Sequence, residues 1–236
     1  MRVLNHAAPC GTRAASQTLL VLLPGAYSAP EEFEAAGFIA AARQAGVAAD
    51  IAIADAHLGY FTDKSVLQRL RDDVVMPARA RGVRNVWLVG ISLGGFGALG
   101  YALRHPAEVS GVVAIAPYLG RRTLLRDIVA GGGPTVWRNT AVPEGPDDVE
   151  TGLWQWLSAP QSAGRPGRAE SDNAPDRPPV WLAYGRDDRF ADSHRLLSSV
   201  LPAERVDTVS GGHDWPPWRA LWDRWLARGL LPTCTP

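Results

Sequence analysis

An apolar run that ends in Gly-x-Ser-x-Gly constrains the fold of this chain more than any other segment. The run covers residues 86–89, Ser92 is the central serine, and a helix-like pattern follows at once. So sharp a strand-to-helix turn holds the serine in a strained backbone conformation, and Gly90 and Gly94 lack the Cβ atoms that would collide where the two arms pack. We therefore expect the Ser92 hydroxyl to project above a sheet, as in a nucleophile elbow. The alternative is a glycine-rich turn that binds phosphate or only connects the two elements.

A serine nucleophile needs a base and a carboxylate that orients the base, and both are expected downstream in the order acid, then histidine. One buried-strand pattern leads into a turn that contains Asp187 and Asp188, and a later one leads into a glycine loop that contains His213. His213 is the expected base. The other four histidines have simpler interpretations: His194 falls in a predicted surface helix, and only His57, just past a predicted strand, is expected to line the cleft as well.

The loop after an earlier apolar run is expected to complete the site. The sequence Pro-Gly-Ala-Tyr follows residues 18–23, and Gly25 allows the backbone to approach a bound carbonyl closely. We expect the amides of Ala26 and Leu93 to donate to the negative charge of a tetrahedral intermediate, and Tyr27 to contact the substrate. A plain structural turn fits this segment nearly as well when it is considered alone.

These segments resemble, in their order along the whole chain, the α/β-hydrolase superfamily. Within it, residues 211–215 with Trp218 nearby resemble the histidine loop of the putative-esterase group, which includes esterase D-like and mycolyltransferase-like enzymes. The resemblance implies an α/β-hydrolase fold. It also implies catalysis by a serine, a histidine and an aspartate.

Carried over by position, the resemblance implies that Ser92 is the nucleophile, Asp188 the acid and His213 the base. Asp188 is preferred to Asp187 because the usual spacing in the group is Gly-x-x-Asp, counted here from Gly185. The chain departs from the group in one place, where Pro-Gly stands before the oxyanion residue instead of the usual His-Gly.

Alternation of apolar runs with helix-like patterns favours a mostly parallel sheet with helices on both faces. A chain of 236 residues with 46% hydrophobic content can bury one sizeable core, so a single domain over residues 1–236 is expected. Strands are expected near residues 19–23, 50–54, 86–89, 112–116, 180–184 and 206–209. Helices are expected over residues 31–45, 65–81 with a bend or end at Pro77, 93–104, 121–130, 147–157 and 216–228.

Residues 118–179 interrupt this alternation and end in a polar loop over 161–179. In α/β-hydrolases an insertion at this place often forms a small lid or one wall of the acyl pocket. That resemblance makes Trp137, Trp154 and Trp156 candidates for an apolar substrate wall. The alternative is that these tryptophans only anchor the insertion to the body.

Charge and cysteine content limit the partners and the compartment. The formal net charge is +0, with 24 basic and 24 acidic residues, so no global field recruits nucleic acid or an anionic membrane. Residues 19–23 are too short to span a bilayer and the first residues lack a continuous apolar segment, so we expect a cytoplasmic protein. Cys10 and Cys234 lie near opposite ends without metal-ligand neighbours, and free thiols are expected unless the protein is exported.

The expected function is hydrolysis of small-molecule carboxylic esters through an acyl-serine, with no metal and no organic cofactor. Two alternatives remain open. The same triad serves acyl transfer in the mycolyltransferase-like enzymes, and a hydrolase fold can serve ligand binding without catalysis.

Overall fold

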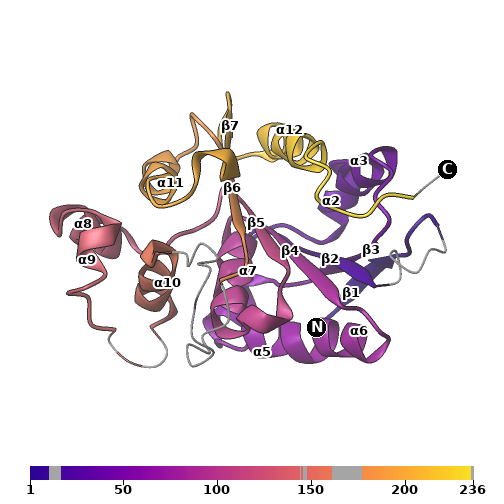
Figure 1. Ribbon diagram of the computed structural model, residues 1–236, viewed down its shortest axis with the longest axis horizontal. Helices are drawn as coiled ribbons and strands as arrows, with labels where there is room; N and C mark the ends of the chain where they lie inside the picture. Colours follow the sequence, from indigo (N-terminus) through magenta and orange to yellow (C-terminus); the bar gives the residue numbers. More distant parts are fainter. Residues whose placement is uncertain (11–16, 144, 146–147, 161–176, 235–236) are drawn as a thin grey trace, which may run out of the picture.

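The computed structural model describes residues 1–10, 17–143, 145, 148–160 and 177–234. In this part of the chain a seven-stranded sheet with the order β1-β3-β2-β4-β5-β6-β7 forms the centre of the molecule (Figure 1). The strands from β2 to β7 run parallel, and β1 pairs antiparallel with β3 at one edge. The strands are β1 Val3–His6, β2 Thr18–Leu23, β3 Asp50–Ala54, β4 Asn85–Ile91, β5 Gly111–Ile115, β6 Val180–Gly185 and β7 Val206–Val209.

Apolar side chains cover both faces of the sheet, which explains why its strands appear in the sequence as continuous apolar runs. All six residues of β2 are buried. Leu19 and Val21 pack into one core cluster, and Leu20 and Leu22, which point to the other face, pack into a second one. The prediction of an α/β fold with two covered faces is confirmed.

Helices supply both covering layers (Figure 1). One face is covered by α2 Glu31–Ala35, α3 Phe38–Gln44 and α12 Trp215–Leu226. The other is covered by α5 Val66–Leu70, η1 Arg71–Val75, α6 Met76–Ala80, α7 Leu93–Arg104, α10 Val149–Ser158 and α11 Ala191–Ser198. The remaining helices are α4 Leu58–Thr62, η2 Pro106–Glu108, α8 Arg122–Ala130, α9 Pro134–Trp137 and η3 Ala203–Arg205, of which α8 and α9 also pack on the second face.

Two predicted helices differ from the observed ones. The helix expected over residues 31–45 is divided into α2 and α3, because Gly37 adopts a φ of 77°, which ends one helix and begins the next. The helix expected over 65–81 continues past Pro77, which sits in the first turn of α6. The π-helical segment η1 precedes it and widens the turn where the proline ring would otherwise meet a carbonyl.

The edge strand β1 was not predicted, because four residues of mixed polarity give no periodic signal. It lies beside β3 and extends the sheet by one antiparallel strand. The predicted insertion contains α8, α9 and α10 in the described residues. Most of the polar loop expected over 161–179 lies outside them, since residues 161–176 are not described.

A disulfide joins Cys10 to Cys234, so the prediction of free thiols is wrong. The two Cα atoms lie 5.9 Å apart because the C-terminal segment returns to the start of β3. There Val47 forms a β-bridge with Thr233, and the Cys234 amide donates to the Gly46 carbonyl at 2.8 Å. None of the helices in the described residues is long and apolar enough to cross a membrane.

Candidate active site

Ser92 occupies a tight turn between β4 and α7. Its φ of 52° and ψ of −115° are a strained conformation for a residue with a side chain. A Cβ on Gly90 would lie 2.2 Å from the Gly94 carbonyl oxygen, and a Cβ on Gly94 would lie 2.2 Å from the Leu23 carbonyl oxygen. The contact of β4, α7 and β2 therefore requires glycine at both positions, and this contact holds the serine at the end of the strand.

Three side chains from the ends of three strands form one continuous hydrogen-bond chain. The Nε2 atom of His213 lies 2.9 Å from the Oγ atom of Ser92, and its Nδ1 atom lies 2.7 Å from Oδ2 of Asp188. Ser92 follows β4, Asp188 follows β6 and His213 follows β7. Since the carboxyl ends of parallel strands lie along one edge of the sheet, residues far apart in the sequence meet there.

The two aspartates of the acid turn have different partners. Asp188 faces His213 with one oxygen and accepts from the Phe190 amide with the other, at 2.8 Å. Asp187 instead accepts from the Gly211 amide at 3.0 Å, which ties the acid turn to the histidine loop. Burial favours the protonated form of Asp188, but hydrogen bonds from His213 and Phe190 outweigh burial and hold the pKa of Asp188 below its usual value.

Two aromatic rings enclose the imidazole of His213. Phe190 lies edge-to-face with it at a centroid distance of 5.1 Å, and Trp218 does so at 5.0 Å. Together with the bond to Asp188, they restrict rotation of the histidine ring. Phe190 was not expected at the site, although its position directly after the acid turn is a signal that could have indicated it.

The loop after β2 lies against the nucleophile. A Cβ on Gly25 would be 3.6 Å from the Cβ of Ser92, so the loop backbone approaches the nucleophile at the residue before the Ala26 amide. Leu93 is the first residue of α7, where helix amides lack intrahelical partners. Neither the Ala26 nor the Leu93 amide donates a hydrogen bond to another group within the described residues.

The expected substrate-contacting residues at the rim are placed as follows. Tyr27 is 92% exposed beside Ala26. His57 is exposed and caps α4, because its Nδ1 accepts from the Gly59 amide at 3.1 Å. Its ring stacks on Tyr60 at 4.3 Å. His57 therefore has local partners, and none of its described contacts reaches Ser92.

The tryptophans of the insertion do not form a common wall. Trp154 has no exposed surface, and its indole N–H donates to the Leu119 carbonyl at 2.7 Å, so the prediction that it contacts substrate is wrong. Trp137 is buried as well, and Trp156 is half-buried under the guanidinium of Arg177. Trp154 fits the alternative that these tryptophans only anchor the insertion to the body.

A cavity of about 800 Å³ runs along α7 between α5 and α10. Phe61, Leu67 and Phe96 give it apolar walls, and Gly97 and Gly100 form part of its floor. Its lining residue Phe96 lies one helical turn after Ser92, and the Phe96 amide donates to the Ser92 carbonyl at 3.2 Å.

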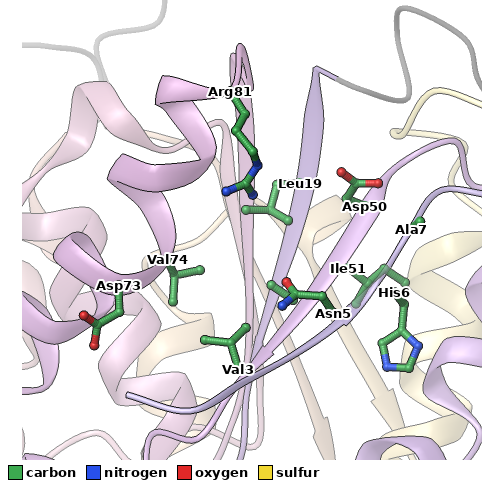
Figure 2. Close-up of a pocket in the computed structure, with 11 residues that line it drawn as sticks. Val3, Asn5, His6, Ala7, Leu19, Asp50, Ile51, Asp73, Val74 and Arg81 are labelled. Atoms are coloured by element: carbon green, nitrogen blue, oxygen red, sulfur yellow. The ribbon is translucent and has the colours of Figure 1, made fainter.

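A second cavity has a volume of about 310 Å³ and is lined in part by residues of β1, β2 and β3 (Figure 2). It is lined by Leu19 and Asp50 at the amino ends of β2 and β3, together with Asn5, Asp73 and Arg81 (Figure 2). It therefore lies at the sheet edge opposite the hydrogen-bonded residues. Among the described residues no group of three His, Cys, Asp or Glu side chains is arranged to hold a metal ion.

Comparison with a family model assigns the chain to one family. The model of a family described as "Putative esterase" matches residues 55–228. A curated relative, the acetyl esterase of Caldicellulosiruptor saccharolyticus, is 24% identical over 179 residues, which cover 74% of this chain. The match spans 62% of that relative's length.

Solved structures of similar fold include several esterases and hydrolases. The S-formylglutathione hydrolase of Staphylococcus aureus has a TM-score of 0.57 at 13% identity, with 90% of this chain and 80% of that chain covered. For an esterase of Pyrobaculum calidifontis the TM-score is 0.58 at 17% identity, with 96% and 83% covered. Est1E of Butyrivibrio proteoclasticus has a TM-score of 0.56 at 13% identity, with 97% and 92% covered. At these identities the likeness shows the α/β-hydrolase fold.

Proposed function

Because the chain belongs to the Putative esterase family, we propose that it is a serine hydrolase that cleaves carboxylic esters through an acyl-serine intermediate. The observation that carries this proposal is the hydrogen-bond chain from Ser92 Oγ through both ring nitrogens of His213 to Asp188. A serine hydroxyl is a weak nucleophile on its own, and a neighbouring imidazole that accepts its proton activates it.

In the first step, Ser92 Oγ attacks the ester carbonyl carbon while His213 Nε2 takes the hydroxyl proton. The Asp188 carboxylate accepts from Nδ1–H, which keeps the imidazole in the correct tautomer and stabilises its cationic form. The amides of Ala26 and Leu93 donate to the oxyanion. The tetrahedral intermediate then collapses, the alcohol leaves with the proton from His213, and the acyl group stays on Ser92.

In the second step, water replaces the alcohol and the same groups act again. His213 takes a proton from water, the hydroxide attacks the acyl carbon, and the collapse of the second intermediate returns the proton to Ser92 Oγ. The carboxylic acid leaves. Each proton removed is returned within the cycle, so this chain's own residues complete it.

The cavity along α7 supports an apolar group on the substrate. Phe61, Leu67 and Phe96 form its apolar lining, and charged residues such as Arg104, Arg121 and Glu150 line other parts of it. Phe96 lies one helical turn from Ser92 on α7. We assign the apolar part of the ester to the apolar part of this cavity, because small-molecule sites combine apolar walls with a limited number of polar groups. Esters of short and medium acyl groups are thus the proposed substrates.

The deciding experiment treats the wild type and Ser92→Ala with a small fluorophosphonate and locates the label by mass spectrometry. p-Nitrophenol release from its acetate and butyrate esters is measured in parallel. Ser199→Ala is the matched control, because Ser199 is an exposed serine whose hydroxyl donates to the Leu196 carbonyl. We expect labelling and turnover in the wild type and the control and neither in Ser92→Ala. Turnover at the wild-type rate in Ser92→Ala would overturn the proposal.

A further inference from the structure

A second histidine is enclosed in the molecule close to the proposed catalytic residues. The sequence predicts a surface position for His194 on α11, but its side chain has no exposed surface, so that prediction is wrong. Its Nε2 atom lies 3.0 Å from the carbonyl oxygen of Pro117. A carbonyl can only accept, so Nε2 carries the proton and donates it. The other ring nitrogen, Nδ1, is buried without a hydrogen-bond partner in the part of the chain that the structure describes.

The carbonyl that His194 binds belongs to the segment directly behind Ser92. The Tyr118 amide donates to the Ser92 carbonyl at 2.9 Å, and Ala116 has a strained φ of 46°. Pro117 also packs on the first turn of α7, since a Cβ on Gly95 would come within 2.9 Å of its Cβ. A shift of Pro117 would therefore move the backbone that holds the serine.

The helix that carries His194 is attached to the acid turn. The backbone carbonyl of Asp188 accepts from the Ala191 amide at 2.8 Å, where α11 begins. One turn later, the His194 amide donates to the Phe190 carbonyl at 3.2 Å. His194 is thus joined to the acid through a single turn of helix.

We propose that His194 is a positioning residue, whose Nε2–H···O=C bond to Pro117 holds the acid turn and the segment behind Ser92 at a fixed separation. This inference rests on the proposed function, because it assigns His194 a role in aligning Ser92, His213 and Asp188. His194 itself touches no reacting atom and acts through Pro117.

The burial of His194 argues against a role in packing alone. A buried nitrogen without a partner destabilises a fold, so an apolar side chain would serve a purely structural position better. What the imidazole adds over an apolar ring is one hydrogen bond, and that bond joins α11, which follows the acid turn, to the segment behind Ser92. The donor, rather than the ring, is the feature that the proposal requires.

Three substitutions separate the donor from the ring. His194→Phe keeps a ring and removes the donor, His194→Gln keeps an amide N–H near the position of Nε2, and His194→Asn places its amide too close to the backbone to reach Pro117. Leu197→Ala is the control, because Leu197 is a fully buried residue of the same helix without a polar group. For each variant we would measure kcat and KM on p-nitrophenyl butyrate, the rate of Ser92 phosphonylation, and Tm.

We expect His194→Phe and His194→Asn to lower kcat and the phosphonylation rate about 30-fold with KM nearly unchanged, because misplaced catalytic groups lower kcat selectively. His194→Gln should stay within about threefold of the wild type. Leu197→Ala should lower Tm and leave kcat nearly unchanged. If His194→Phe does not fold, the contrast between the Gln and Asn variants decides.

The proposal is overturned if folded His194→Phe or His194→Asn keeps the wild-type kcat, or if Leu197→Ala loses as much kcat as they do. It is also overturned if His194→Gln is as slow as His194→Asn. Ser92→Ala is measured alongside: an inactive Ser92→Ala with a fully active His194→Phe refutes only the positioning role. Activity in Ser92→Ala refutes the proposed function itself.

Discussion

The Oδ2 atom of Asp188 lies 2.7 Å from the Nδ1 atom of His213, and both side chains are almost completely shielded from solvent. Asp187, one residue earlier, has its carboxylate at the Gly211 amide instead. Two adjacent aspartates of one turn therefore have different partners, one on the histidine ring and one on the backbone of the histidine loop. Substitution of each aspartate in turn therefore gives a matched pair of variants that tests the proposed mechanism.

Asp188→Asn is expected to lower kcat about 10³- to 10⁴-fold, because an amide that donates to Nδ1 stabilises the wrong tautomer of the base. Asp187→Asn should stay within about tenfold of the wild type, since the Asn oxygen can still accept from the Gly211 amide. The measurement is kcat on p-nitrophenyl acetate for both variants, with circular dichroism to verify folding. Equal losses in the two variants would contradict the assignment of Asp188 as the acid.

Much of this site follows from the sequence because each proposed catalytic residue lies in the turn or loop that follows a strand pattern. A run such as Val86–Val89 must be a buried strand, and the carboxyl ends of parallel strands share one edge. The prediction for His194, which lies close to the acid turn, was less accurate, because the burial of this residue depends on contacts between distant segments. His194 has the helical spacing of a surface residue, and only the course of the chain after β5 brings the Pro117 carbonyl over it.

The insertion and the cysteines show the same limit. Trp154 and Trp156 differ by two positions on one helix, so the sequence cannot tell which of them faces the body. The structure buries Trp154 and leaves Trp156 half-exposed. Cys10 and Cys234 are 224 positions apart, and only the return of the C-terminal segment to β3 brings them together.

Gly94→Ala is expected to prevent folding or to lower the free energy of unfolding by about 4 kcal/mol, because its Cβ would overlap the rigid backbone of β2. Gly152→Ala is the control: its Cβ would meet only the Leu103 side chain, at 3.9 Å. In the helix α10 this change should add up to about 1 kcal/mol of stability. Urea unfolding of both variants tests the expectation, and a stable Gly94→Ala variant would refute the requirement for glycine there.

Cys10→Ser with Cys234→Ser is expected to lower the free energy of unfolding by about 2–4 kcal/mol, because the disulfide closes nearly the whole chain into one loop. Activity at 25 °C should be unchanged, since the disulfide lies at the start of β3 and not at the carboxyl edge of the sheet. Tm with and without dithiothreitol measures the effect. A Tm in the wild type that does not respond to dithiothreitol would show that the bond does not form or does not stabilise the protein.

Gly100→Leu is expected to lower kcat/KM for p-nitrophenyl octanoate about tenfold more than for the acetate, because the new side chain projects into the cavity along α7. A Cβ at this position meets Leu67 and Val149 at 3.6 Å, an ordinary contact distance, and circular dichroism verifies that the longer side chain leaves the fold intact. Rates over a series of acyl lengths provide the measurement. An equal effect on all lengths would mean that the acyl group lies elsewhere.

A fall in pH should destabilise the protein, because His194 takes up a proton more readily in the unfolded chain than in the folded one. Burial lowers the pKa of His194 to about 4, whereas an unfolded chain takes up the proton near the ordinary pKa of about 6.5. The unfolded state therefore binds more protons between these values. The stability from neutral His194 is complete above pH 6.5 and is lost as the pH falls toward 4, by about 1.4 kcal/mol per pH unit.

His194→Gln removes this titration and serves as the reference for it, because it leaves Asp188, His213 and Arg195, the charged groups near the ring, in place. We expect the wild type to lose about 2–3 kcal/mol more than His194→Gln between pH 7 and pH 4.5, where the carboxylates contribute equally to both. Urea unfolding at the two pH values measures the difference. Parallel losses in the two proteins would mean that His194 titrates normally and is not enclosed, and the bond to Pro117 would then lose its support.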